Sequence, residues 1–143
     1  MHALPSVLRP EQLTAKRISP NDTNYFALLV DPVETEPDCV FVIEIYEPRG
    51  ATPPNVHQHA YEFFFILKGH CKAISGDTEI ELSAGDFLTV PPGGEHIVEN
   101  LSDEKLYALC LMQPNEEFAE IIRAGEDVPL SEADLNVLRG LSA

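Results

Sequence analysis

The chain alternates short apolar runs with turn-forming residues over most of its 143 positions. Ser75-Gly76-Asp77, Ala84-Gly85 and the Pro-Pro-Gly-Gly stretch at 91–94 separate several of the runs. Runs of this length between turn residues are typical of β-strands, and strands without intervening helices predict an antiparallel sandwich or barrel. We expect strands at residues 25–30, 39–46, 62–67, 70–75, 78–82, 86–90, 96–99 and 105–112.

The C-terminal part has a helical pattern instead. Asn115 can cap a helix that carries three apolar residues on one face and ends at Gly125. Ser131 and Asp134 have the spacing of a capping box, which predicts a second short helix after them.

These patterns predict a single domain over residues 1–143. The barrel core covers about 39–113, and a helical tail follows at 114–143. Residues 1–24 contain three prolines and no clear period, so we expect an arm or short strands there.

The charge is strongly negative, with 9 Lys+Arg against 24 Asp+Glu and a formal net charge of −15. Such a field repels nucleic acid and anionic membranes, so we expect a small-molecule ligand and neither of those partners. We find no signal peptide and no apolar run near the roughly 18 residues of a membrane span. Three cysteines without a CxxC pair indicate reduced core residues, and we expect a cytoplasmic protein.

Two histidines, His57 and His59, stand just before an apolar run that starts near Glu62. Residues two apart in a strand face the same way, so both imidazoles can converge on one point, with Glu62 following after a short bend. Imidazole and carboxylate groups both bind first-row metals, at about 2.0–2.2 Å. The histidine pair alone is equally consistent with two half-exposed side chains that bind nothing.

A third histidine strengthens the metal hypothesis. His96 follows the tight turn at 91–94 and begins the next predicted strand. Three of the five histidines thus belong to two strand-and-turn elements, whereas His2 and His70 belong to neither. We interpret His70, which follows a turn glycine, as a surface residue.

These two elements resemble the paired motifs of the cupin superfamily. The first family motif reads G(x)5HxH(x)3–4E(x)6G, and Gly50, His57, His59, Glu62 and Gly69 follow it with two changes of spacing. The second reads G(x)5PxG(x)2H(x)3N, and its five defining positions match at every spacing: Gly85, Pro91, Gly93, His96 and Asn100.

The two changes of spacing both fall in the first motif. Six residues, rather than five, separate Gly50 from His57, in a loop with two prolines. Two residues, rather than three or four, separate His59 from Glu62. Glu62 is therefore either a direct metal ligand or a carboxylate that orients a histidine.

The resemblance implies an antiparallel double-stranded β-helix, the cupin or jelly-roll barrel, with the predicted helices outside it. It implies that His57, His59, Glu62 and His96 bind one divalent transition metal: Fe, Mn, Ni, Co or Zn. It also favours a small quercetin-dioxygenase-like cupin. The alternatives are a metal-dependent isomerase or decarboxylase, and a cupin that binds metal or ligand without catalysis.

Strand alternation predicts which side chains line the pocket. If Glu62 points inward, so do Phe64 and Ile66, and His96 brings Val98 and Asn100 with it. Such a pocket is largely apolar and suits an aromatic or otherwise apolar oxygen-bearing substrate, although aromatics in these positions are also typical of a plain core. Two tyrosines and a glutamate are candidate acid/base groups at its edge: Tyr46, Tyr107 and Glu44.

The strand at 39–46 predicts an assembly. Phe41, Ile43 and Ile45 alternate with Val40, Val42 and Glu44, so both faces of the strand are largely apolar. One face can fill the barrel, and the other needs a cover, either the N-terminal arm or a second subunit. We expect a homodimer.

Overall fold

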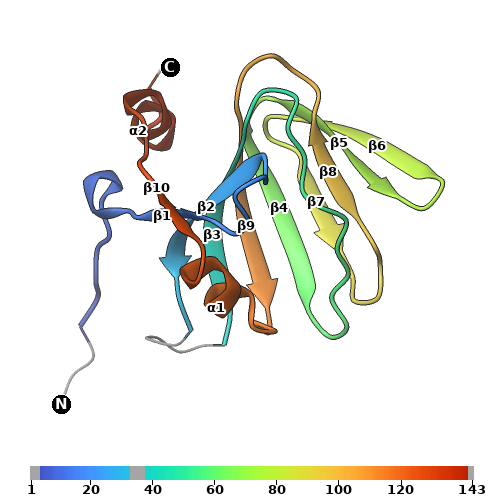
Figure 1. The fold of residues 1–143 in the computed structure, drawn as a ribbon, viewed down its shortest axis with the longest axis horizontal. Helices are drawn as coiled ribbons and strands as arrows, with labels where there is room; N and C mark the ends of the chain where they lie inside the picture. Colours follow the sequence, from blue (N-terminus) through green and yellow to red (C-terminus); the bar gives the residue numbers. More distant parts are fainter. Residues whose placement is uncertain (1–3, 33–37, 142–143) are drawn as a thin grey trace.

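The computed structural model describes residues 4–32 and 38–141, and most of them belong to antiparallel strands (Figure 1). The eight predicted runs are strands β2–β9, and each boundary agrees to within one residue. Within the described residues the strands are β1 (Ala15–Arg17), β2 (Asn24–Val30), β3 (Val40–Tyr46), β4 (Tyr61–Lys68), β5 (His70–Ser75), β6 (Thr78–Ser83), β7 (Phe87–Val90), β8 (Ile97–Asn100), β9 (Leu106–Gln113) and β10 (Glu126–Val128).

The strands form two antiparallel sheets. The larger sheet has the order β10-β1-β2-β3-β9-β4-β7, and the smaller has the order β6-β5-β8. Strand β9 lies between β3 and β4, although residues 47–105 separate β3 from β9 in the sequence (Figure 1). The predicted all-β cupin barrel, with two short helices outside it, is confirmed.

The inner core fills the space between the two sheets. Val42 and Phe64 reach it from the larger sheet, and Ala73 and Val98 from the smaller one. Because successive side chains of a strand point to opposite faces, the even-numbered residues of β3 belong to this core, and Ile43 and Ile45 point outward.

A second apolar cluster covers the outward face of β3. Ile43 and Ile45 pack with Ala15 of β1 and with Val137 of α2 (Glu132–Leu138). The N-terminal segment, one of the two predicted covers, therefore covers this part of the strand together with α2, which was not predicted as a cover.

A buried carboxylate fixes α2 on the sheet. Asp134 is fully buried and accepts hydrogen bonds from the hydroxyls of Tyr107 at 2.7 Å and Tyr25 at 2.9 Å. Lys105 Nζ lies 3.3 Å from the same side chain. The predicted capping box is also present, with Asp134 N donating to Ser131 Oγ and Ser131 N donating to Asp134 Oδ2, both at 3.1 Å.

The helix α1 (Phe118–Arg123) begins later than a cap at Asn115 predicts. Glu116 and Glu117 have φ values of 48° and 66°, so the backbone takes two left-handed residues before the helix starts. Asn115 still acts as a cap, because its Oδ1 accepts from Ala119 N at 2.9 Å. Among residues 4–32 and 38–141, no helix is long and apolar enough to cross a membrane.

Candidate metal centre

Three ligand-type side chains from distant parts of the sequence meet at one end of the inner core. His57 precedes β4, Glu62 is the second residue of β4, and His96 precedes β8. Their nearest nitrogen and oxygen atoms all lie within 4.8 Å of one another. Nε2 of His96 is 2.8 Å from Oε1 of Glu62, and Nε2 of His57 is 3.5 Å from the same oxygen.

Backbone contacts between the two motifs hold the cluster together. Gly93 N donates to His57 O at 2.7 Å, so the turn after β7 is joined to the loop before β4. Gly93 has a φ of 83°, a conformation that favours glycine at this turn. Asn55 and His96 form an isolated antiparallel bridge in which each backbone N donates to the other's carbonyl, at 3.3 and 3.0 Å.

The contacts of His96 suit a cation. Its Nδ1 lies 3.2 Å from Gly94 O, and a carbonyl can only accept, so Nδ1 carries a proton. Its Nε2 faces the Glu62 carboxylate at 2.8 Å, which also requires a proton between the two groups when no metal is bound. A divalent metal would replace that shared proton and take up the Nε2 lone pair and the carboxylate charge.

The pKa shifts agree with this arrangement. Burial acts to raise the pKa of Glu62, but hydrogen bonds from His57 and His96 outweigh it and hold the pKa below its usual value. Burial acts to lower the pKa of His96, but the hydrogen bond to Glu62 and its negative charge outweigh it and raise the pKa. Without metal, the Glu62 carboxylate is therefore a buried anion between two imidazoles. This arrangement favours a metal cation in place of the proton that Glu62 shares with His96.

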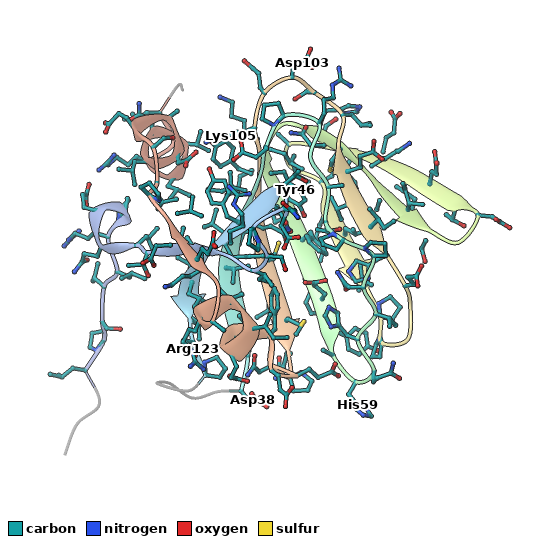
Figure 2. The ribbon with its side chains drawn as sticks, in the orientation of Figure 1. Asp38, Tyr46, His59, Asp103, Lys105 and Arg123 are labelled. Atoms are coloured by element: carbon teal, nitrogen blue, oxygen red, sulfur yellow. The ribbon has the colours of Figure 1, made fainter. Side chains whose placement is uncertain are left out.

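His59 does not belong to the cluster. Its side chain is exposed and lies at the edge of the molecule (Figure 2), while its backbone N donates to the Glu116 carboxylate. The expectation that His57 and His59 face the same way assumed a strand at these positions. Residues 56–60 form a bend outside any strand, so the two-residue alternation does not apply and only His57 turns inward.

A cavity of about 390 Å³ opens beside the cluster. His57 and Glu62 line one part of it, and its walls are largely apolar, with Phe26, Phe64 and Phe118 among them. Its size lies within the usual range of small-molecule sites, about 300–1,000 Å³. Among the described residues that line the cavity there is no lysine or arginine.

A second buried carboxylate lines the same cavity. Glu44 is 2% exposed and accepts a hydrogen bond from Asn24 Nδ2 at 2.9 Å. Burial, and then repulsion by Glu62, raise the pKa of Glu44 to about 7. Asn24 Oδ1 is buried and has no hydrogen-bond partner among the described residues. The sequence did not single out Asn24 or Asn55, which also lines the cavity, because an asparagine near a strand end is usually a turn residue.

The structure separates the two candidate catalytic tyrosines. Tyr107 lies on the outer face of the larger sheet, where its hydroxyl donates to Asp134. The cavity is on the opposite, inner face of that sheet. Tyr46 is fully buried in the inner core beside Glu44, and burial raises its pKa well above the usual value. Neither tyrosine lines the cavity, and of the three candidate acid/base groups only Glu44 does.

Of the apolar side chains predicted to line the pocket, Phe64 does line the cavity. Ile66 and Val98 are core residues packed between the sheets. Asn100 has a structural role, since its Nδ2 donates to the carbonyls of Glu47 at 3.0 Å and Glu104 at 2.7 Å. Strand alternation identified the inward faces correctly, but which inward residues reach a cavity depends on how the two sheets splay apart.

Comparison with known proteins agrees with the fold and the motifs. Residues 42–112 match the cupin domain family. No curated protein sequence matches the chain.

Several solved structures share the architecture. A predicted oxalate decarboxylase from Thermotoga maritima is 22% identical, with a TM-score of 0.68 over 75% of this chain and 97% of that one. KdgF from Halomonas sp. is 15% identical, with a TM-score of 0.66 over 78% and 94%. A sugar phosphate isomerase of the cupin superfamily from Silicibacter pomeroyi is 14% identical, with a TM-score of 0.65 over 75% and 74%. At these identities the likeness shows the fold and leaves the reaction open.

Proposed function

We propose that this cupin is a metal-dependent dioxygenase that acts on an apolar, oxygen-bearing small molecule. The observation that carries the proposal is the convergence of two imidazoles and one carboxylate, from His57, His96 and Glu62, at the wall of an apolar cavity. Two histidines and one carboxylate with open positions are the ligand set of non-haem Fe(II) oxygenases. A divalent iron held there would supply activation of O₂ and of a substrate oxygen.

The cavity favours an aromatic or otherwise apolar substrate. Phe26 and Phe118 pack edge to face, with ring centroids 5.4 Å apart, and both line the cavity. A planar apolar molecule would bury its surface against such walls and be shielded from water. A phosphate or a polycarboxylate would instead meet Glu44 and Glu62 with no lysine or arginine among the described lining residues, which disfavours sugar phosphates.

The Glu44 and Asn24 pair gives the cavity a polar end. Asn24 holds one carboxylate oxygen of Glu44, and its own Oδ1 has no donor among the described residues. Two acceptors on one wall suit a substrate hydroxyl, which would donate to Asn24 or Glu44 while its ring lies against the phenylalanines. Glu44 can take up such a proton because its pKa is about 7.

Oxygen consumption tests the proposal directly. Metal-free protein is loaded anaerobically with Fe(II), Mn(II), Ni(II), Co(II) or Zn(II) and mixed with catechols or flavonols in an oxygen electrode. We expect O₂ uptake that depends on both metal and substrate, is lost in Glu62→Ala, and is retained in His59→Ala. Substrate conversion without O₂ uptake would indicate an isomerase or decarboxylase, and tight binding without conversion of any substrate would indicate a ligand-binding cupin. Either result would reject the dioxygenase proposal.

A further inference from the structure

We propose that the amide oxygen of Asn55 is the fourth protein donor of this metal centre, at the position that sequence analysis gave to His59. The inference rests on metal binding by the cluster and not on turnover, so it can hold even if the dioxygenase proposal fails. Three observations support it: the pairing of Asn55 with His96, the lack of a hydrogen-bond partner for the Asn55 amide oxygen, and the spacing between His57 and Glu62.

Asn55 lies directly opposite His96. The two residues exchange both backbone hydrogen bonds, at 3.3 and 3.0 Å, and form an isolated antiparallel bridge. Side chains of directly opposed residues in an antiparallel pair project to the same side. The Asn55 side chain therefore leaves the backbone on the side from which His96 reaches Glu62, and Asn55 lines the cavity together with His57 and Glu62.

The Asn55 amide oxygen lacks a partner. Its Oδ1 is buried and accepts no hydrogen bond from any described residue. A buried carbonyl oxygen that has left water without gaining a donor is destabilising, and such atoms are rare in folded proteins. A cation bound by His57, Glu62 and His96, at the cavity that Asn55 also lines, would give this oxygen the partner it lacks.

The spacing of the first motif supports the same assignment. Four residues separate His57 from Glu62, which is a spacing that the motif allows between its second histidine and its glutamate. In that alignment His57 takes the second histidine position and Asn55, two residues earlier, takes the first. The two-residue gap after His59 then needs no explanation, because His59 is not part of the ligand set.

The assignment has a chemical consequence. The donors would be two imidazole nitrogens and two oxygens, one from a carboxylate and one from an amide. Oxygen donors suit harder cations, so this set favours Mn(II) and Fe(II) relative to Zn(II) more than a three-histidine set does.

Cobalt titration of the metal-free protein tests Asn55 against His59. We expect Asn55→Ala to weaken Co(II) binding at least 10-fold and to change the visible ligand-field bands, because a donor is lost. We expect His59→Ala to match the wild type in affinity and spectrum. The reverse pattern, or an Asn55→Ala variant with wild-type affinity and spectrum, would overturn the assignment. Circular dichroism and thermal unfolding without metal establish that each variant is folded.

A gain-of-function variant separates a ligand from a merely structural residue. Asn55→His places a third imidazole in the proposed position, so we expect Zn(II) affinity to rise at least 10-fold relative to Mn(II) affinity. A structural asparagine would give no such change in metal preference, and an unchanged Zn(II)/Mn(II) ratio in a folded Asn55→His variant would count against the proposal. Neither measurement uses substrate or O₂, so its outcome is independent of the dioxygenase assay.

Discussion

Nε2 of His96 lies 2.8 Å from Oε1 of Glu62, although the two residues are 34 positions apart in the chain. Both side chains are almost fully buried, at 3% and 4% exposure. Two strands of different sheets hold them, since Glu62 belongs to β4 and His96 directly precedes β8. The closing of the two sheets into one barrel therefore makes the centre, and disturbing either residue should alter the other.

Glu62→Gln should lower the pKa of His96. The Glu62 carboxylate raises the pKa of His96 against the opposing effect of burial, and a neutral amide removes that charge. Titration of the His96 ring protons by NMR in metal-free protein measures the shift. An unchanged His96 titration would mean that the two side chains do not interact in solution.

Glu44→Gln should make the metal-free protein more stable at alkaline pH. The folded pKa of Glu44 is about 7, above its ordinary value of 4.5. The folded state thus keeps a proton that the unfolded chain releases, and the wild type loses stability as the pH rises from 4.5 to about 7. The Glu44→Gln variant has no carboxyl at this position and does not lose this stability. Its thermal midpoint should therefore exceed that of the wild type by more at pH 8 than at pH 4.5. Equal differences at the two pH values would contradict the raised pKa.

Asp134→Asn should destabilise the protein at neutral pH by about 2–3 kcal/mol, because two tyrosine hydroxyls lose a buried anionic acceptor. Burial acts to raise the pKa of Asp134, but the hydrogen bonds from Tyr107, Ser131 and Tyr25 outweigh it and lower the pKa. The lowered pKa means that this stability is present above the unfolded pKa of about 3.9 and is lost as the pH falls through the folded value.

Urea unfolding between pH 7 and pH 3 tests this expectation for Asp134→Asn. The difference from wild type should shrink toward the acid end. Asp127→Asn is the matched control, since Asp127 pairs with Lys16 at 2.6 Å but its side chain is 85% exposed. That control should change the free energy of unfolding by less than about 1 kcal/mol. If the two proteins differed in free energy of unfolding by the same amount at every pH, Asp134 would stabilise the fold through packing and not through its charge.

Glu116→Ala should loosen the loop that carries His57. The Glu116 carboxylate accepts from the backbone N of His59 and, at 3.2 Å, from that of Gln58. Hydrogen exchange at these two amides should become faster, and Co(II) affinity should fall with little change in the ligand-field bands, because the ligands remain. Glu117→Ala is the control, since that side chain is the exposed neighbour. Equal exchange rates in the two variants would show that Glu116 does not hold the loop.

Phe87→Glu should dissociate a homodimer. Phe87 is 61% exposed, and it lines an apolar groove of about 460 Å³ together with Phe41, Phe63, Phe65, Leu109 and Leu111 on the outer face of the larger sheet. This groove is the part of that face that the N-terminal segment and α2 leave open. We expect a second copy of the chain to cover it, because an apolar groove with no charged residue among its described lining can pair with itself despite the net charge of −15.

Light scattering at micromolar concentration tests the dimer. The wild type should have twice the 15.8 kDa mass of one chain, and Phe87→Glu should have the mass of one chain with its circular dichroism unchanged. Ile80→Glu, at a 49% exposed position in the smaller sheet, should stay dimeric. A wild-type mass of one chain would reject the prediction.

The sequence alone determined the strands, the barrel and the neighbourhood of the candidate metal centre. Strand length and the turns between strands are local properties, so the eight runs matched β2–β9 closely. The second motif lies on a rigid turn that enters a strand, and His96 is where its spacing predicts. Glu62 is likewise at the inward face of β4, as alternation requires.

Only the tertiary structure decided which residues share the site. His59 turns outward because residues 56–60 bend instead of continuing a strand, and Asn55 faces the cavity because it pairs with His96 from the other motif. Tyr107 and Glu44 lie on adjacent strands but on opposite faces, so one holds α2 through Asp134 and the other lines the cavity. Contacts of this kind join residues far apart in the chain, and periodicity within one segment carries no information about them.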